Sequence, residues 1–259
     1  MRRPLPIALG CAAVAALIYL LALHTTAGGH VDAAVLDAFA RLRSPWLDAL
    51  ALDLVRFLDP APFVLLAAAL AAIALARGMP RHALVAAGVL GGAALTSQLL
   101  KPLLASPRPW ETPAASEIGF GSWPSGHTTA AVALALCVVL IVPRRPVYVV
   151  AAGFALAVPC ALVLLGSHWP SDVLGGVCVA GLWFALGVAV LPRVPVPRVS
   201  PRAVVALVLA GAVAVLVAAA ARPGTTAEFV QEHTTIAAAA GLLAVACAVL
   251  VAGARVARR

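Results

Sequence analysis

Long apolar runs, separated by short polar segments, are the feature that most limits how this chain can fold. Of its 259 residues, 63% are hydrophobic and only 11% are charged, and the mean hydropathy is +1.05. A soluble domain of this length could not bury so much apolar surface. A helix needs about 20 apolar residues to cross the hydrocarbon core of a bilayer, and several runs approach that length. The sequence therefore predicts an all-α, polytopic membrane protein.

Six apolar runs precede a linker rich in proline and arginine, and two more follow it. We place them at 5–23, 61–76, 82–100, 127–142, 147–165, 172–191, 203–221 and 236–251. The predicted organisation is a six-span core over residues 1–193, then a linker and a C-terminal transmembrane hairpin over 194–259, giving about eight transmembrane helices. The first run could be read as a signal peptide, but the six-span core needs it, so we interpret it as retained.

Residues 31–58 differ from these runs because acids and arginines lie between apolar positions at helical spacing. This pattern predicts one or two amphipathic helices on the membrane surface, with a break near Ser44 and Pro45. In the third span, Gly88 and Gly92 are four residues apart and predict a face of small residues for close helix contact.

The distribution of basic residues predicts the orientation in the membrane. With the N-terminus in the cytoplasm, 12 of the 18 basic residues lie inside and all 10 acids lie outside. The basic bias is what sets orientation, so we expect both termini to be cytoplasmic. The formal charge of +8 forms no single patch, and nucleic acid is not an expected partner. The polar segments 101–125 and 166–171 then share the outer side, where they can meet.

The cysteines give no sign of a metal site or a disulfide framework, because their spacing matches neither. All five lie inside apolar runs, where we interpret them as small core residues: Cys11, Cys137, Cys160, Cys178 and Cys247. We expect no metal and no cofactor.

The sequence Pro-Ser-Gly-His at 124–127 stands directly before the fourth apolar run. Ser125, Gly126 and His127 therefore fall at a helix start, where free backbone N–H groups and the helix dipole attract anions. Gly126 has no side chain to keep a phosphate oxygen from the backbone. His127 adds a titratable proton beside that anion. The alternative is an ordinary loop and helix cap that contains a histidine.

Two further stretches carry polar side chains of the same kind. Lys101, the only lysine of the chain, precedes Arg108. A lysine here could act as a point-charge donor to an anion. An anchor at the membrane interface is an equal alternative. His168 and Asp172 are one helical turn apart, so the carboxylate can accept the imidazole N–H and stabilise its cationic form. Alone, Asp172 could simply be an acid that stabilises a helix start.

Together these stretches form the pattern Lys-x6-Arg-Pro at 101–109, Pro-Ser-Gly-His at 124–127 and His-x3-Asp at 168–172. The pattern resembles the type 2 phosphatidic acid phosphatase superfamily, whose members include glucose-6-phosphatase and the vanadium haloperoxidases. The resemblance covers roughly residues 5–191 and leaves out the C-terminal hairpin. It implies a membrane phosphatase that works without a metal.

The resemblance also implies a role for each site residue. His168 would be the nucleophile that forms a phosphohistidine, Asp172 would orient it, and His127 would protonate the leaving oxygen and later activate water. The phosphate would be held by Lys101, Arg108, Ser125 and the Gly126 amide. Cations and helix-start amides suit phosphoryl transfer, which depends on in-line positioning and charge stabilisation.

The sequence departs from the family pattern at Leu162, where the third motif usually has an arginine that binds phosphate. By family geometry this side chain would point towards the phosphate. One alternative function is therefore a catalytically impaired protein that binds lipid phosphates. If the protein is active, we expect another outer arginine to compensate, from the set Arg41, Arg43, Arg56 and Arg222.

The expected function is hydrolysis of a lipid phosphomonoester or pyrophosphate at the outer face of the cell membrane. Candidate substrates are phosphatidate, phosphatidylglycerol phosphate and polyprenyl pyrophosphates such as undecaprenyl pyrophosphate. A transporter would need ionisable or helix-breaking residues near mid-membrane, and Pro159 is the only clear breaker within a span. The expected partners are the lipid phosphate substrate and membrane lipids, and a homo-oligomer stays open.

Overall fold

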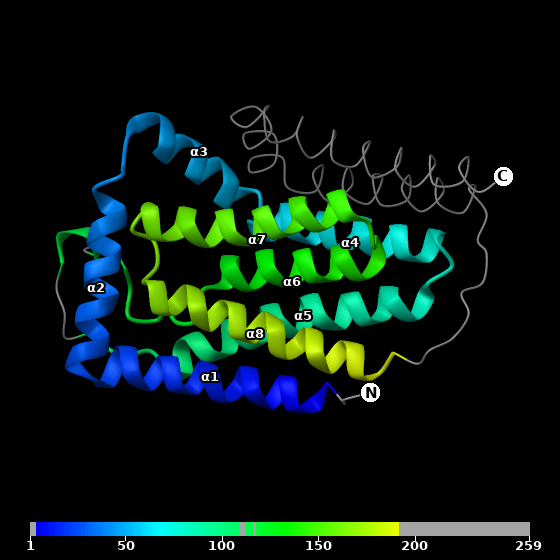
Figure 1. Ribbon diagram of the computed structural model, residues 1–259, viewed down its shortest axis with the longest axis horizontal. Coiled ribbons are helices and arrows are strands. Elements are labelled where there is room, and N and C mark those ends of the chain that lie inside the picture. Colours follow the sequence, from blue (N-terminus) through cyan, green and yellow to red (C-terminus); the bar gives the residue numbers. More distant parts are fainter. Residues whose placement is uncertain (1–3, 109–111, 116–117, 192–259) are drawn as a thin grey trace, which may run out of the picture. The chain divides into compact units, whose positions relative to one another are not determined.

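The computed structural model describes residues 4–108, 112–115 and 118–191, which form helices and no strand (Figure 1). The helices are α1 (Leu5–His24), α2 (Thr26–Ala40), α3 (Pro45–Arg56), α4 (Pro60–Ala76), α5 (Pro80–Leu103), α6 (Gly126–Ile141), α7 (Arg145–Leu164) and α8 (Pro170–Ala189), with a short 3-10 helix η1 (Pro113–Ala115). The predicted all-α architecture is confirmed. The predicted linker and hairpin over 194–259 lie outside the described residues, so that domain division stays a prediction.

Proline marks the start of most of these helices. A proline occupies the first or second position of α1, α3, α4, α5, α7 and α8. Its fixed φ suits the first turn, and the N–H that it lacks has no intrahelical partner there. Side chains start the other two helices: Thr25 Oγ1 accepts a hydrogen bond from Gly28 N (3.1 Å) before α2, and Ser125 Oγ accepts one from Thr128 N (3.3 Å) before α6.

Four described helices, α1, α5, α7 and α8, are individually long and apolar enough to cross a membrane. Helices α3 and α4 meet this criterion only together, as a pair bent by 56°, and α6 is a shorter apolar helix of 16 residues. At 1.5 Å per residue α6 rises about 24 Å, which is less than the hydrocarbon thickness of about 30 Å. The chain is a multi-pass membrane protein.

Helix α8 packs against α1, α5 and α6, and small residues permit the close contacts. The ring of Trp183 covers Gly92, where an added Cβ would lie 2.5 Å from the ring, and its Nε1 donates to Thr96 Oγ1 (2.9 Å). By contrast, an added Cβ at Gly88 would meet nothing within 4 Å. The prediction of a small-residue face is therefore right at Gly92 and wrong at Gly88.

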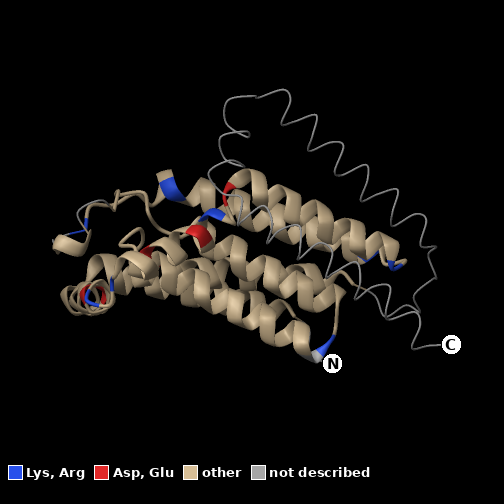
Figure 2. Ribbon diagram, turned by 90° about the horizontal axis from the view of Figure 1, so that it is seen from above, with Lys and Arg blue, Asp and Glu red and all other residues tan. Residues whose placement is uncertain are grey.

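Helix α2 crosses the ends of the long helices, as Figure 1 shows, and contacts η1, α7 and α8. It ends at Ala40 and α3 begins at Pro45, so the predicted break near Ser44 is confirmed. Acidic and basic residues lie mainly near helix ends, and the long helices are uncharged along most of their length (Figure 2). The segment 31–58 thus folds onto the end of the bundle that carries the polar loops.

Candidate active site

The turn from α7 into α8 presents His168 beside Asp172. Gly166 makes this turn possible, because its φ of +66° is in the left-handed region that favours glycine. Asp172 is fully buried, and its Oδ2 accepts a hydrogen bond from Trp169 N (3.0 Å) and lies 3.4 Å from His168 Nδ1. The imidazole contact is longer than an ideal hydrogen bond. It leaves Nε2 as the ring nitrogen directed away from the carboxylate.

The start of α6 is bonded directly to the start of α8. Ser125 N donates to the Asp172 carbonyl (2.9 Å), and Thr129 Oγ1 lies 3.3 Å from the Gly176 carbonyl. A Cβ at Gly176 would lie 2.7 Å from the Ser125 carbonyl, so only glycine permits this approach. Ser125 is fully buried, and its hydroxyl caps α6. The Pro-Ser-Gly-His and His-x3-Asp stretches are thereby held together.

Lys101 completes the helix start from the last turn of α5. Its Nζ lies 3.9 Å from the point that a Cβ on Gly126 would occupy, and Gln98 Nε2 lies 3.4 Å from the same point. The amides of Gly126 and His127 are in the first turn of α6, where the helix supplies no acceptor. An ammonium group and a side-chain amide therefore lie beside Gly126 at the start of α6, and this combination suits the binding of an oxyanion next to the helix start.

Arg108 is buried between two acids. Its Nη1 donates to Asp32 Oδ2 (2.6 Å) and to Ser171 Oγ (3.0 Å), and its Nη2 donates to Asp172 Oδ1. The guanidinium carbon lies 4.9 Å from the centre of the Trp169 ring, a cation–π contact. Arg108 thus lies beside Asp172, and three of its five N–H donors are engaged by protein groups, while its predicted role in binding phosphate stays a prediction.

Asp32 of α2 was not predicted as a site residue from the sequence. Its Oδ1 accepts from Ser171 N (2.8 Å) and its Oδ2 from Ser171 Oγ (2.6 Å), in addition to Arg108. Burial raises the pKa of Asp32 above its ordinary value, although the bonds from Ser171 and the charge of Arg108 oppose that shift. An acid within the otherwise mainly apolar stretch 31–36 is the one signal that could have identified it.

His127 has a carboxylate partner that was also missed. Its Nε2 lies 3.2 Å from Oδ1 of Asp59, the residue before α4. His168 and Lys101 are within electrostatic range of the same imidazole. The predicted residues Lys101, His127 and His168 are therefore near one another at one end of the bundle.

Leu162 is buried, and its expected orientation towards the phosphate stays a prediction. Its side chain is 1% exposed and belongs to the apolar core with Val158 and Trp169. Of the arginines proposed to compensate, Arg41 is exposed, and Arg43 pairs with Asp48 at 2.9 Å on the surface. Arg222 lies outside the described residues, and Arg56 is only partly buried. The segment 31–58 reaches the site through an acid, Asp32.

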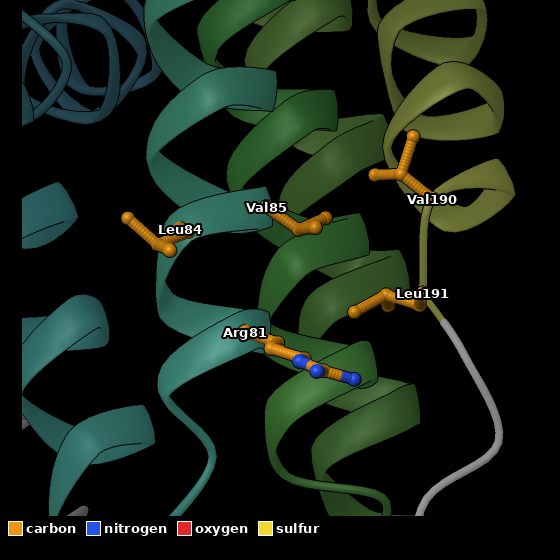
Figure 3. Close-up of a pocket in the computed structure, with 5 residues that line it drawn as sticks. All are labelled: Arg81, Leu84, Val85, Val190 and Leu191. Carbon is orange, nitrogen blue, oxygen red and sulfur yellow. The ribbon is translucent and has the colours of Figure 1, made fainter.

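The opposite end of α5 and α8 carries a separate hollow, lined by Arg81, Leu84, Val85, Val190 and Leu191 (Figure 3). Arg81 is its only ionisable side chain, so it offers no acid–base pair. Across the described ranges, no group of three His, Cys, Asp or Glu residues could hold a metal ion.

Comparison with known proteins now identifies the family. The PAP2 superfamily model matches residues 82–195. Phosphatidylglycerophosphatase B of Bacillus subtilis is 31% identical over 180 residues, which cover 66% of this chain and 88% of that protein. The chain belongs to the PAP2 superfamily. The resemblance inferred from the three motifs is confirmed.

Other relatives of this PAP2 protein agree with the assignment. Lipid A 1-phosphatase of Rhizobium etli is 36% identical over 80 residues, which cover 31% of this chain and only a third (33%) of that relative. The crystal structure of a transmembrane PAP2 type phosphatidylglycerolphosphate phosphatase from Bacillus subtilis superimposes with a TM-score of 0.60 at 27% identity. That match covers 75% of this chain and 100% of the solved chain.

Proposed function

We propose that this PAP2 protein is a lipid phosphatase that transfers the phosphoryl group of its substrate to His168 and then to water. The observation that carries this proposal is the meeting of three groups at one end of the bundle. These groups are the His168–Asp172 pair, with 3.4 Å between Nδ1 and Oδ2, the imidazole of His127, and Lys101 beside the start of α6. A nucleophile, an acid–base group and an anion site are what the reaction needs.

In the first step, His168 Nε2 attacks phosphorus and the bond from phosphorus to the lipid oxygen breaks. The imidazolium of His127 gives its proton to that oxygen, so the lipid leaves as an alcohol, or as a lipid phosphate when the substrate is a pyrophosphate. In the second step, water attacks the phosphohistidine and gives a proton to His127. The P–N bond breaks, and inorganic phosphate leaves with His168 and His127 in their starting states. In both steps the proton on His168 Nδ1 stays on that nitrogen and is directed at the Asp172 carboxylate.

The phosphoryl oxygens have several potential donors. Lys101 lies close to Gly126, whose amide is in the first turn of α6, and Ser125 holds the helix start in position through its cap. Arg108 has two N–H donors left after its bonds to Asp32, Ser171 and Asp172, and these can reach a phosphate. Gln98 is a neutral donor that could add to this set in the absence of the third-motif arginine.

The substrate class follows from where the site lies and from the relatives. Relatives of this chain are named for phosphatases of lipid A and of phosphatidylglycerol phosphate, which are both phosphates on lipids. The site lies at the ends of apolar helices, where a lipid tail can stay in the bilayer while the phosphate meets water. The distribution of basic residues supports an orientation in which this end faces outside the cytoplasm.

Phosphate release from purified protein tests the proposal. A panel of phosphatidate, phosphatidylglycerol phosphate, lipid A and undecaprenyl pyrophosphate should include a substrate, and His168→Ala should abolish its turnover. Brief reaction with radiolabelled substrate and an alkaline quench should trap acid-labile label on His168. His82→Ala, at the opposite end of α5, is the matched control and should keep full activity.

The alternative is a protein that binds lipid phosphates without hydrolysing them. It is favoured because Leu162, a core residue, stands where the family usually has a phosphate-binding arginine. It is also favoured because Asp32 and Asp172 already neutralise the charge of Arg108. Saturable binding of one panel lipid without phosphate release would establish this alternative. Full turnover by His168→Ala would remove His168 from the nucleophile role.

A further inference from the structure

Asp59 occupies the N-cap position of α4, where an aspartate ordinarily caps its own helix. It is the residue before α4, and a carboxylate there usually accepts a hydrogen bond from an amide of the first turn. The Asp59 side chain makes no such cap bond. Its Oδ1 lies instead 3.2 Å from Nε2 of His127, which is 68 residues away in the sequence. Asp59 also lies outside the segment 82–195 that matches the family model.

The other charged groups near His127 are basic. Among the described groups, Asp59 acts on this imidazole from the start of α4, Lys101 from α5, and His168 from the turn before α8. Lys101 and a protonated His168 both disfavour a positive charge on His127. Asp59 is therefore the partner that stabilises the imidazolium, which is the form that must protonate the leaving oxygen.

We propose that Asp59 is a positioning residue for His127, an inference that rests on the proposed function. Its carboxylate accepts the Nε2–H and leaves Nδ1 as the nitrogen that exchanges protons with the lipid oxygen and with water. The Nε2 proton stays beside Asp59 in both steps. The two histidines then use opposite ring nitrogens, because His168 is held by Asp172 through Nδ1.

Partial exposure limits the size of this effect. The side chain of Asp59 is 41% exposed and that of His127 is 32% exposed, so water weakens their attraction. Solvent also gives both groups access to protons. We therefore expect Asp59 to increase the proton affinity of His127 by less than a fully buried carboxylate would.

The test compares Asp59→Asn, Asp59→Glu and the control Asp48→Asn, which removes an acid paired with Arg43 on the surface. With dioctanoyl phosphatidate, whose alkoxide is a poor leaving group, kcat of Asp59→Asn should fall about tenfold near neutral pH. This is less than the roughly 10²–10⁴-fold that a general acid contributes, because fewer His127 side chains are protonated but the imidazole itself remains. With dioctanoylglycerol pyrophosphate, a better leaving group, the fall should be smaller. The pH limb that depends on His127 should move to lower pH, and Asp59→Glu should restore part of the loss.

A readout without turnover separates this inference from the proposed function. Nitrogen NMR of histidine-labelled protein, assigned with His127→Gln, should show His127 protonated at Nε2 in the neutral form. Its titration midpoint should move to lower pH in Asp59→Asn and stay unchanged in Asp48→Asn. An unchanged midpoint, or equal losses of kcat on both lipids without a moved limb, would overturn the role of Asp59. A third outcome separates the two proposals. If the His127 titration midpoint moves in Asp59→Asn while His168→Ala still turns over normally, His168 is not the nucleophile, but the role of Asp59 beside His127 stands.

Discussion

Asp32 and Arg108 form a buried ion pair, with 2.6 Å between Oδ2 and Nη1, across 76 residues of sequence. The same guanidinium also bonds Asp172, so one cation serves two buried carboxylates. The pair connects α2 to the start of α8, where Asp172 holds His168. Helix α2 therefore helps to hold Asp172, and through it His168, in position.

Asp32→Asn tests whether burial or the attraction of Arg108 dominates the pKa of this acid. Burial raises the pKa of Asp32 above its ordinary value of 3.8, so the folded protein binds this proton more tightly than the unfolded chain does. The contribution of Asp32 to the free energy of unfolding is then fully present below the unfolded pKa and is lost as pH rises through the folded pKa. Asparagine is neutral at every pH and should remove that loss. The apparent Tm of the variant, relative to the parent, should rise from acidic to neutral pH.

The control for this titration is Asp37→Asn, a partly exposed acid of the same helix. It measures how the loss of an acid from α2 that lacks the Arg108 contact changes the Tm across the same pH range. If the relative Tm of Asp32→Asn falls as pH rises, attraction to Arg108 outweighs burial and the direction stated here is wrong.

Arg108→Met should be far more damaging than the loss of either acid alone. It leaves Asp32 and Asp172 buried near each other without a cation, and breaking a buried pair costs about 3–5 kcal/mol of the free energy of unfolding. Arg43→Met removes an exposed ion pair with Asp48 and should cost about 0–1 kcal/mol. Denaturation in detergent micelles measures both. Equal costs would show that the Arg108 network adds little to stability.

Gly176→Ala should separate the two halves of the site. The added Cβ would lie 2.7 Å from the Ser125 carbonyl, so α8 must move away from the start of α6. We expect a lower Tm and lower turnover, with the cost of overpacking at about 1–3 kcal/mol. Gly153→Ala in α7 meets nothing within 4 Å and should be neutral or slightly stabilising. Unchanged turnover in Gly176→Ala would mean that this close approach is dispensable.

Leu162→Arg should destabilise the protein and leave its turnover no higher. The leucine is 1% exposed in the apolar core, where burying a larger, charged side chain is expected to cost several kcal/mol. Leu162→Met, of similar volume, should cost less than about 1.5 kcal/mol. Thermal unfolding and phosphate release distinguish the two variants. Faster phosphate release by Leu162→Arg would instead indicate that an arginine at this position can reach the site.

Cysteine labelling tests the orientation. On a background without native cysteines, an impermeant thiol reagent applied outside the cell should label Ser167→Cys, in the turn before α8. It should not label Arg144→Cys, at the opposite end of α7. The reverse pattern would place the site in the cytoplasm, because one membrane side faces each end of the bundle.

Local chemistry was enough to predict the helices and the motif residues. Apolar runs require helices in lipid, where each backbone polar group must find its partner within the segment. Prolines marked several starts, such as Pro60 and Pro170, to within a few residues. Lys101, His127, His168 and Asp172 could be named because each stands at a helix end, where spacing along the chain already constrains the chemistry.

Packing decided the partners of these residues, which no local pattern encodes. Asp59 precedes a helix-starting proline, so its position alone suggests an ordinary cap. Its carboxylate contacts His127 only because α6 packs near the start of α4. Asp32 meets Ser171 across 139 residues because α2 crosses the end of α8. Leu162 packs in the apolar core, which its position in the motif did not indicate. Side-chain partners follow from how helices cross, and the spacing of residues along each helix leaves that crossing undetermined.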